Sequence, residues 1–225
     1  MAQTWRDLLF AHWPARPDAL RPFIPDGLNL DTFEGDAWIG VVPFDLAYLS
    51  LRQSPERLAL SFLELNVRTY VTAEGKPGVW FFSLDAASPL AVAVARATFH
   101  LPYFRARMGL IRDGERIIYA SQRAHTGAPN AAFVGSYGPT GPVVYAQPGA
   151  LDHWLTERYC LYSRDYRGRI YRGEITHAPW PLQPAAAEIT VNTAIEPFDI
   201  RLIGPPVLHF SRRLDVIAWR PVRLR

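Results

Sequence analysis

The stretch from Phe62 to Met108 constrains the fold more than any other part of the chain. Its first part, F-L-E-L-N-V-R-T-Y-V, alternates with the two-residue period of a β-strand. One face carries leucine, valine and threonine and is typical of a core. The other face places a carboxylate, an amide and a guanidinium between two aromatic rings: Phe62, Glu64, Asn66, Arg68 and Tyr70. On an open sheet this face would meet solvent, whereas inside a wide barrel it would form a polar pocket wall.

Turn, strand and helix signals follow this strand. The segment E-G-K-P-G around Lys76 supplies turn chemistry, and the apolar run Val79–Leu84 predicts a second strand. Ser88 and Pro89 then suit the N-cap and the first position of a helix, which we expect Pro102 to end. The local order is therefore strand, turn, strand, helix.

Composition supports one large, β-rich domain over residues 1–225. The chain is 49% hydrophobic and 13% aromatic, with 20 prolines and 15 glycines spread along it. Such frequent turn residues indicate many short strands rather than long helices. The aromatic content suits a β core filled by large side chains. No repeat or long linker divides the chain into separate domains.

A second main helix is predicted over Leu151–Tyr162, where apolar residues recur at helical spacing. Within it, Arg158 is expected to pair with a core carboxylate or to extend along the surface. Cys160, the single cysteine of the sequence, is interpreted as a small buried hydrophobic residue.

Proline and glycine positions predict the remaining strands. Pro43 suggests that the strand over 36–45 ends at an edge or at a bulge. The segment Ser54–Arg57 predicts a break before the polar strand. Further strands are predicted over 106–123 (a hairpin turning at Asp113-Gly114), 131–137, 169–175, 188–195, 207–210 and 214–219. The fold class that fits these elements is α+β, a closed or nearly closed, mainly antiparallel β-barrel or cone with two main helices.

Four segments of the chain resemble a known family. They are E-L-N-V-R-T-Y-V, G-V-W-F-F-S-L-D-A, A-R-A-T-F-H-L-P-Y and E-R-Y-C-L-Y, and they look like the YqjF-like proteins of the DUF2071 family. The resemblance covers nearly the whole chain. The chain is also similar, more distantly, to the acetoacetate decarboxylase superfamily. There a strand carboxylate and a helix arginine accompany a G-F-P-K-K segment, whose first lysine forms a Schiff base with a ketone.

The resemblance implies a barrel with a pocket, but not the decarboxylation chemistry. Laid on the superfamily pattern, Glu64 matches the strand carboxylate, Arg96 the helix arginine, and the H-L-P segment at His100 the G-F-P segment. Tyr103 then stands where the first lysine would be. A phenol cannot form an iminium with a ketone, and the only lysine of the sequence, Lys76, lies in a turn.

The polar strand face is the leading candidate site. Glu64 could act as a general acid or base if burial raises its pKa, with Tyr103 as its catalytic partner. Arg68 or Arg96 could hold a carboxylate. The groups that could orient a carbonyl or hydroxyl are Asn66, Tyr70, His100 and Tyr103. The alternative is that Glu64 and Arg68 form a structural ion pair on one strand face.

Charge and spacing disfavour several other classes. The net charge of +3 rests on arginines interspersed with apolar residues, which is not the basic stripe of a nucleic-acid-binding protein. No apolar run is long enough to span a membrane and no signal peptide is evident, so a cytoplasmic protein without membrane contact is expected. The six histidines lack metal-site spacing, and neither a metal nor another cofactor is expected.

Three hypotheses about function stay open. The first is a small-molecule-binding protein or enzyme that lacks the Schiff-base lysine and moves a proton on a small carbonyl or carboxylate compound, as a lyase, hydratase or isomerase. The second is a non-catalytic ligand sensor or carrier. The third is a structural or partner-binding barrel filled by its own aromatic residues. Homo-oligomer formation, which the distant relatives show, also stays open.

Overall fold

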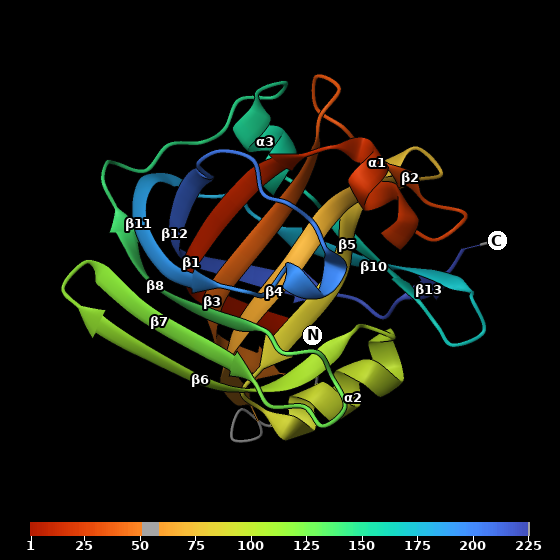
Figure 1. Ribbon diagram of the computed structural model, residues 1–225, viewed down its shortest axis with the longest axis horizontal. Coiled ribbons are helices and arrows are strands. Elements are labelled where there is room, and N and C mark those ends of the chain that lie inside the picture. Colours follow the sequence, from red (N-terminus) through yellow and green to blue (C-terminus); the bar gives the residue numbers. More distant parts are fainter. Residues whose placement is uncertain (51–58, 225) are drawn as a thin grey trace.

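The computed structural model describes residues 1–50 and 59–224. Strands dominate it and the helices are short (Figure 1). The strands are β1 (Ala2–Ala15), β2 (Asn29–Leu30), β3 (Ala37–Ser50), β4 (Leu60–Ala73), β5 (Lys76–Ala86), β6 (Tyr103–Asp113), β7 (Arg116–Arg123), β8 (Ala132–Pro139), β9 (Cys160–Arg164), β10 (Ile170–His177), β11 (Gln183–Asn192), β12 (Val207–Ala218) and β13 (Val222–Arg223). The helices are α1 (Pro17–Leu20), α2 (Pro89–Phe99) and α3 (Leu151–Thr156), with 3-10 turns η1 (Arg21–Phe23) and η3 (Glu196–Phe198).

The described strands form one 13-stranded sheet that curls into a ring. Its order is β13-β10-β9-β5-β6-β7-β8-β11-β12-β1-β3-β4-β2, and further pairings join β5 to β4 and β10 to β12. Most pairs are antiparallel, while β5 runs parallel to β6 and to β9. The predicted, mainly antiparallel barrel with few helices is therefore confirmed.

The extra pairings close two rings that share the wall β5-β4-β3-β1-β12. The large ring is completed by β6, β7, β8 and β11, and the small ring by β9 and β10. Two long strands make this division, because each changes partner along its length. β5 pairs with β9 at Val79 and with β6 from Leu84 onward. β12 pairs with β11 at Phe210 and with β10 near Ala218.

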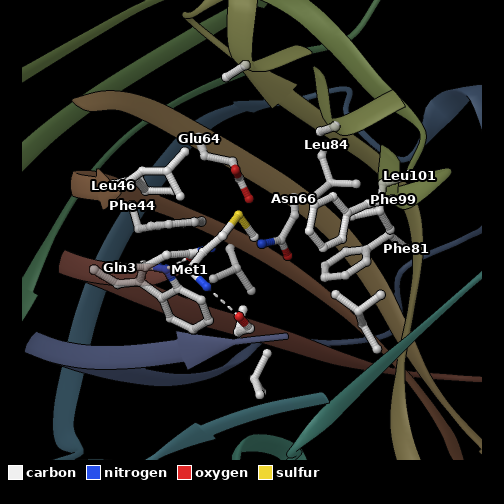
Figure 2. Close-up of a pocket in the computed structure, with 18 of the residues that line it drawn as sticks. Met1, Gln3, Phe44, Leu46, Glu64, Asn66, Phe81, Leu84, Phe99 and Leu101 are labelled. Atoms are coloured by element: carbon white, nitrogen blue, oxygen red, sulfur yellow. Dashed lines mark hydrogen bonds between the residues drawn. The ribbon is translucent and has the colours of Figure 1, made fainter. Parts of the chain in front are cut away.

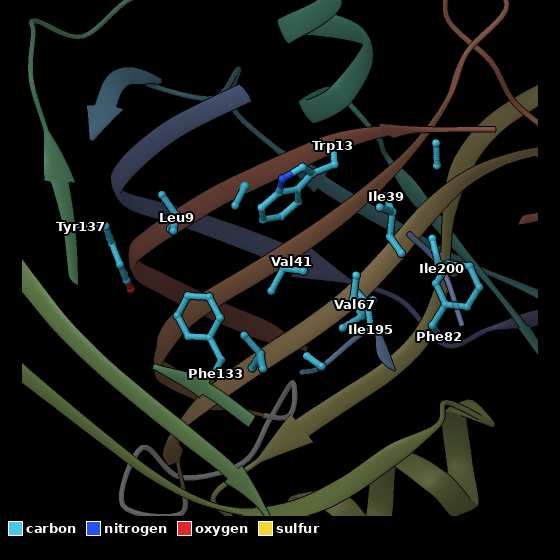
Figure 3. Close-up of a cluster of buried hydrophobic side chains, with 14 of the residues drawn as sticks. Leu9, Trp13, Ile39, Val41, Val67, Phe82, Phe133, Tyr137, Ile195 and Ile200 are labelled. Carbon is cyan, nitrogen blue, oxygen red and sulfur yellow. The ribbon is translucent and has the colours of Figure 1, made fainter. Parts of the chain in front are cut away.

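The large ring is filled by a hydrophobic core, whereas the small ring contains the candidate functional site. In the large ring, Leu9, Val41 and Val67 of the shared wall pack with Phe133 and Tyr137 of β8 (Figure 3). Because the shared wall has a ring on each side, both faces of its strands are buried. This accounts for the nearly continuous burial along β4, which an open sheet would not give.

The second predicted helix is wrong beyond Thr156. Helix α3 ends there, and the chain then forms β9, which pairs with β10 and with the start of β5. β10 follows β9 after a short turn, whereas β5 comes from a distant part of the sequence. The two strands offer hydrogen bonds on both sides of the segment, so strand pairing overrides the helical spacing. Cys160 is buried as expected, and Arg158 pairs with Asp31 as expected.

Three further sequence predictions need correction. β3 runs through Pro43 to Ser50, but Pro43 lies opposite an irregularity of β1, so the predicted bulge is confirmed and the predicted strand end is wrong. α2 ends at Phe99, three residues before Pro102. The two strands predicted over 207–219 are one strand, β12.

Two sequence predictions concern other parts of the chain. The predicted break at Ser54–Arg57 lies outside the described residues. Within the described ranges, no helix is long and apolar enough to cross a membrane.

Candidate functional site

The small ring encloses a cavity of about 630 Å³. Its walls come from β1, β3, β4, β5, β9 and β10, and α2 lies beside the ends of β5 and β6 and contributes further lining (Figures 1 and 2). Most lining groups are apolar, among them Trp5, Phe44, Phe62, Phe81, Leu84 and Trp180. Met1 also reaches the cavity, where its ammonium donates to the carbonyl of Ala218 at 2.6 Å (dashed in Figure 2).

A row of polar side chains lies along one wall of this cavity. Glu64, Asn66 and Arg68 follow each other on β4 at every second residue, and each lines the cavity while only 4, 5 and 9% exposed. The pleat of the strand separates neighbouring members by about 6.6 Å. The predicted inward orientation is thus confirmed for Phe62, Glu64, Asn66 and Arg68.

Glu64 is a buried carboxyl that titrates near neutrality. Burial raises its pKa to about 7, although hydrogen bonds from Tyr103 and Asn66 act in the opposite direction. The Tyr103 hydroxyl donates to Oε2 at 2.8 Å. A second phenol, that of Tyr119, donates to the Glu64 backbone carbonyl at 2.8 Å and fixes the strand at this point. A carboxyl with such a pKa can both accept and return a proton at neutral pH.

Tyr103 reaches Glu64 because of the way the chain leaves α2. His100 adopts a left-handed conformation with φ 54°, and the chain then enters β6, where Tyr103 pairs with Leu84 in parallel. Burial, followed by the charge of Glu64, raises the pKa of the Tyr103 phenol well above its ordinary value. The phenol therefore stays protonated and serves as a hydrogen-bond donor.

Arg68 carries a buried charge that has no ionic partner among the described residues. Its guanidinium lies over the rings of Phe10 and Tyr70, with its Cζ 5.1 and 5.8 Å from their centroids. Among the ion pairs of the described residues, none involves Arg68, so the alternative of a Glu64–Arg68 pair is not observed. Its Nε and the Oδ1 of Asn66 are buried and have no hydrogen-bond partner within the described part of the chain.

Tyr70 follows Glu64, Asn66 and Arg68 on the same strand face, but it does not line the cavity. Its hydroxyl lies 2.7 Å from Nε2 of His12 on β1. Burial, together with the charge of Arg68, lowers the pKa of His12 well below its ordinary value, so this histidine is neutral. Gly40 is required beside it, because a Cβ at that position would lie 2.8 Å from the His12 ring.

Arg158 is a site residue to which the sequence assigned only a structural role. It is buried, lines the cavity, and holds its Cζ 4.9 Å from the centroid of Tyr70. Its Nη1 donates to Asp31 at 2.6 Å, whereas its Nη2 is buried without a hydrogen-bond partner in the described structure. Two guanidiniums therefore flank one tyrosine ring. The E-R-Y-C-L-Y segment does not indicate that Arg158 lies against Tyr70, because Tyr70 is distant in sequence.

Like Tyr70, the predicted ligand-binding residues Arg96 and His100 lie outside the cavity lining. Arg96 is exposed on α2, and its Nη1 donates to the backbone carbonyl of Tyr103 at 2.7 Å. This contact holds the backbone that presents the phenol to Glu64. The ring centroids of His100 and Tyr171 lie 4.9 Å apart. In the described ranges, no group of three or more histidine, cysteine, aspartate and glutamate side chains is arranged to hold a metal ion.

Comparison with known proteins identifies the family of the chain. Residues 2–215 match the model of DUF2071, an uncharacterized conserved protein. The chain belongs to the DUF2071 family. A curated relative of this DUF2071 protein is the uncharacterized protein YqjF of Bacillus subtilis (strain 168), which is 48% identical over 225 residues, covering 99% of this chain and 91% of YqjF.

Solved structures show that this DUF2071 protein has the acetoacetate decarboxylase-like fold. The enduracididine biosynthesis enzyme MppR, complexed with pyruvate, matches with a TM-score of 0.69 at 12% identity, over 100% of this chain and 90% of MppR. Acetoacetate decarboxylase from Legionella pneumophila matches with a TM-score of 0.64 at 13% identity, over 100% of this chain and 87% of that enzyme. An acetoacetate decarboxylase-like enzyme from Sphingomonas wittichii RW1 matches with a TM-score of 0.64 at 14% identity, over 100% and 92% of the two chains.

Proposed function

We propose that this DUF2071 protein binds a small carbonyl or carboxylate compound in the small-ring cavity and moves a proton on it through Glu64. The observation that carries the proposal is the polar row itself: a carboxyl with a pKa of about 7 and an unpaired guanidinium, buried on one wall of an apolar cavity. A low-polarity surrounding strengthens the interaction of both groups with a ligand. The pyruvate held by MppR, which has the same fold, supports the choice of ligand class.

Each group has a role in this proposal. Arg68 pairs with a ligand carboxylate and so compensates a charge that is costly to bury alone. Asn66 donates to a carbonyl or hydroxyl oxygen. Glu64 takes a proton from a carbon next to the carbonyl and returns it, and Tyr103 holds Glu64 by its hydrogen bond.

The proposed chemistry involves no Schiff base. Lys76, the only lysine of the sequence, starts β5 and pairs with Glu174 on β10. It does not belong to the residues that line the cavity. Proton transfer of lyase, hydratase or isomerase type is therefore proposed in place of imine-dependent decarboxylation.

Solvent exchange tests this function. The protein is incubated in deuterated buffer with a panel of 2- and 3-keto acids, and loss of carbon-bound protons is followed by NMR. We expect exchange above the uncatalysed rate that grows as the pH rises through about 7, since the ionised carboxylate is the base. Glu64→Gln should reduce the rate by about 10²–10⁴-fold, while the matched variant Glu188→Gln, an exposed glutamate on β11, should not.

The same panel separates the alternatives. Ligand binding by the native protein without any proton exchange favours the second candidate, a non-catalytic carrier, which the largely apolar cavity lining also suits. Absence of both binding and exchange contradicts the proposal. Borohydride reduction in the presence of acetoacetate should leave both Lys76 and the Met1 amine unlabelled, and labelling of either amine would contradict the mechanism without a Schiff base.

A further inference from the structure

The cavity is larger than a small keto acid requires. A volume of 630 Å³ corresponds to about 20 water-sized volumes of ~30 Å³ each. A four-carbon keto acid has about seven non-hydrogen atoms and would occupy roughly a third of this space. The remaining space is lined by carbon, and burying apolar surface there is favourable.

Apolar residues line the cavity at both ends of the polar row, and on the side of Glu64 that is away from Arg68 they continue to the surface. Phe62 is the next inward-facing residue of β4, and it pairs with Leu46 of β3. Leu90 and Val94 of α2 line the cavity and yet are 60 and 48% exposed. The cavity therefore reaches the surface beside α2 through an apolar opening.

The opposite end of the row has a surplus of positive charge. Arg68 and Arg158 both line the cavity and both lie against Tyr70. Among the described residues, Asp31 is the carboxylate paired with Arg158, and Arg68 has none. His12 beside them is neutral. One buried positive charge is thus left for a ligand to balance, and leaving it unpaired is costly.

We infer that the ligand of this cavity is an amphiphilic monocarboxylic acid, a straight-chain aliphatic or arylalkyl acid of roughly eight to twelve carbons by the volume available. Its carboxylate pairs with Arg68 and Arg158, its body passes Asn66 and Glu64, and its tail lies beside Phe62 and α2. The inference rests on the proposed function, because the substrate is then an acid of this shape that carries a carbonyl, and Glu64 takes a proton from the carbon next to that carbonyl and returns it. It narrows the substrate class from small organic acids to acids with a long apolar body.

A chain-length series on the native protein tests the inference. Dissociation constants are measured by calorimetry for straight-chain carboxylates of four, six, eight and ten carbons, and for decanol. We expect each added methylene to tighten binding about fourfold until the cavity is filled. Decanol, which lacks the charge, should bind at least tenfold more weakly than decanoate.

Arginine variants test the charged end. Arg68→Met and Arg158→Met should each weaken decanoate binding by at least tenfold and leave decanol binding within about twofold. Arg107→Met removes the same charge from an exposed position on β6 and should change neither constant. Near-UV circular dichroism verifies that each variant keeps its tertiary packing, and the series on the native protein stands even where a variant does not fold.

The outcomes distinguish this inference from the proposed function. Equal affinity for the four-carbon and ten-carbon acids overturns the inference and leaves the proposed function in place. Equal affinity for decanol and decanoate overturns it as well. Length-dependent, arginine-dependent binding of decanoate without proton exchange on keto acids supports the inference and contradicts the catalytic part of the proposed function.

Discussion

Replacing Asp85 with alanine is expected to lower the free energy of unfolding by about 3–5 kcal/mol. Arg123 of β7 donates to the two oxygens of Asp85 of β5, from Nε at 2.7 Å and from Nη2 at 3.1 Å. The two side chains are 2 and 1% exposed. The variant would leave the guanidinium buried over the ring of Phe104 with no counterion. Urea unfolding followed by circular dichroism measures the loss.

A surface pair provides the matched control for this prediction. Asp18→Ala removes a carboxylate from the exposed pair with Arg16, whose side chains are 75 and 65% exposed for arginine and aspartate, and no measurable loss is expected. An Asp85→Ala protein as stable as the native one would show that the pair is not buried as described. The prediction bears on the site, since the pair joins β5 to β7 next to the contact of Leu84 with Tyr103.

Glu64→Gln is expected to stabilise the protein at alkaline pH relative to the native chain, by about 3 kcal/mol. The pKa of Glu64 is about 7 in the folded protein against an ordinary value of 4.5. The folded state therefore binds more protons between these two values. This contribution to stability is fully present below pH 4.5 and is lost as the pH rises through about 7. A gap of about 2.5 units at 1.36 kcal/mol each gives the magnitude.

The pH dependence of the stability difference shows whether it comes from the raised pKa of Glu64. The difference in unfolding free energy between Glu64→Gln and the native protein should grow in favour of the variant from pH 4.5 to pH 8. Glu188→Gln, which alters an exposed glutamate, should give a difference that does not change with pH in this way. A constant difference for Glu64→Gln over the whole range would mean that the pKa of Glu64 is the same in the folded and the unfolded protein.

Local patterns in the sequence were sufficient for the parts of the fold that depend on neighbouring residues. The alternation from Phe62 to Tyr70 predicted both the strand and its unusual polar face. Ser88 was predicted as an N-cap, and its hydroxyl accepts from the backbone amide of Ala91 at 3.3 Å. Such features are set by side-chain direction and by nearby backbone groups, which a sequence displays directly.

Features set by distant partners could not be read in the same way. The apolar spacing of 151–162 fits a helix, yet pairing with the distant strand β5, together with β10, makes its second half a strand. Tyr70 continues the polar alternation, but its hydroxyl is engaged by His12, 58 residues away. Arg158 belongs to the site only because the small ring brings it to Tyr70. Each of these outcomes depends on which strands pair when the sheet closes, and local periodicity does not indicate that pairing.

A site-resolved titration of Glu64 tests the buried proton-transfer site on β4 most directly. The protein is labelled with ¹³C at the glutamate carboxyl carbons, and the Glu64 resonance is assigned by its absence from Glu64→Gln. We expect a midpoint near pH 7. A midpoint near the ordinary glutamate value of 4.5 would mean that this carboxyl faces bulk water, and it would contradict a buried proton-transfer site on β4.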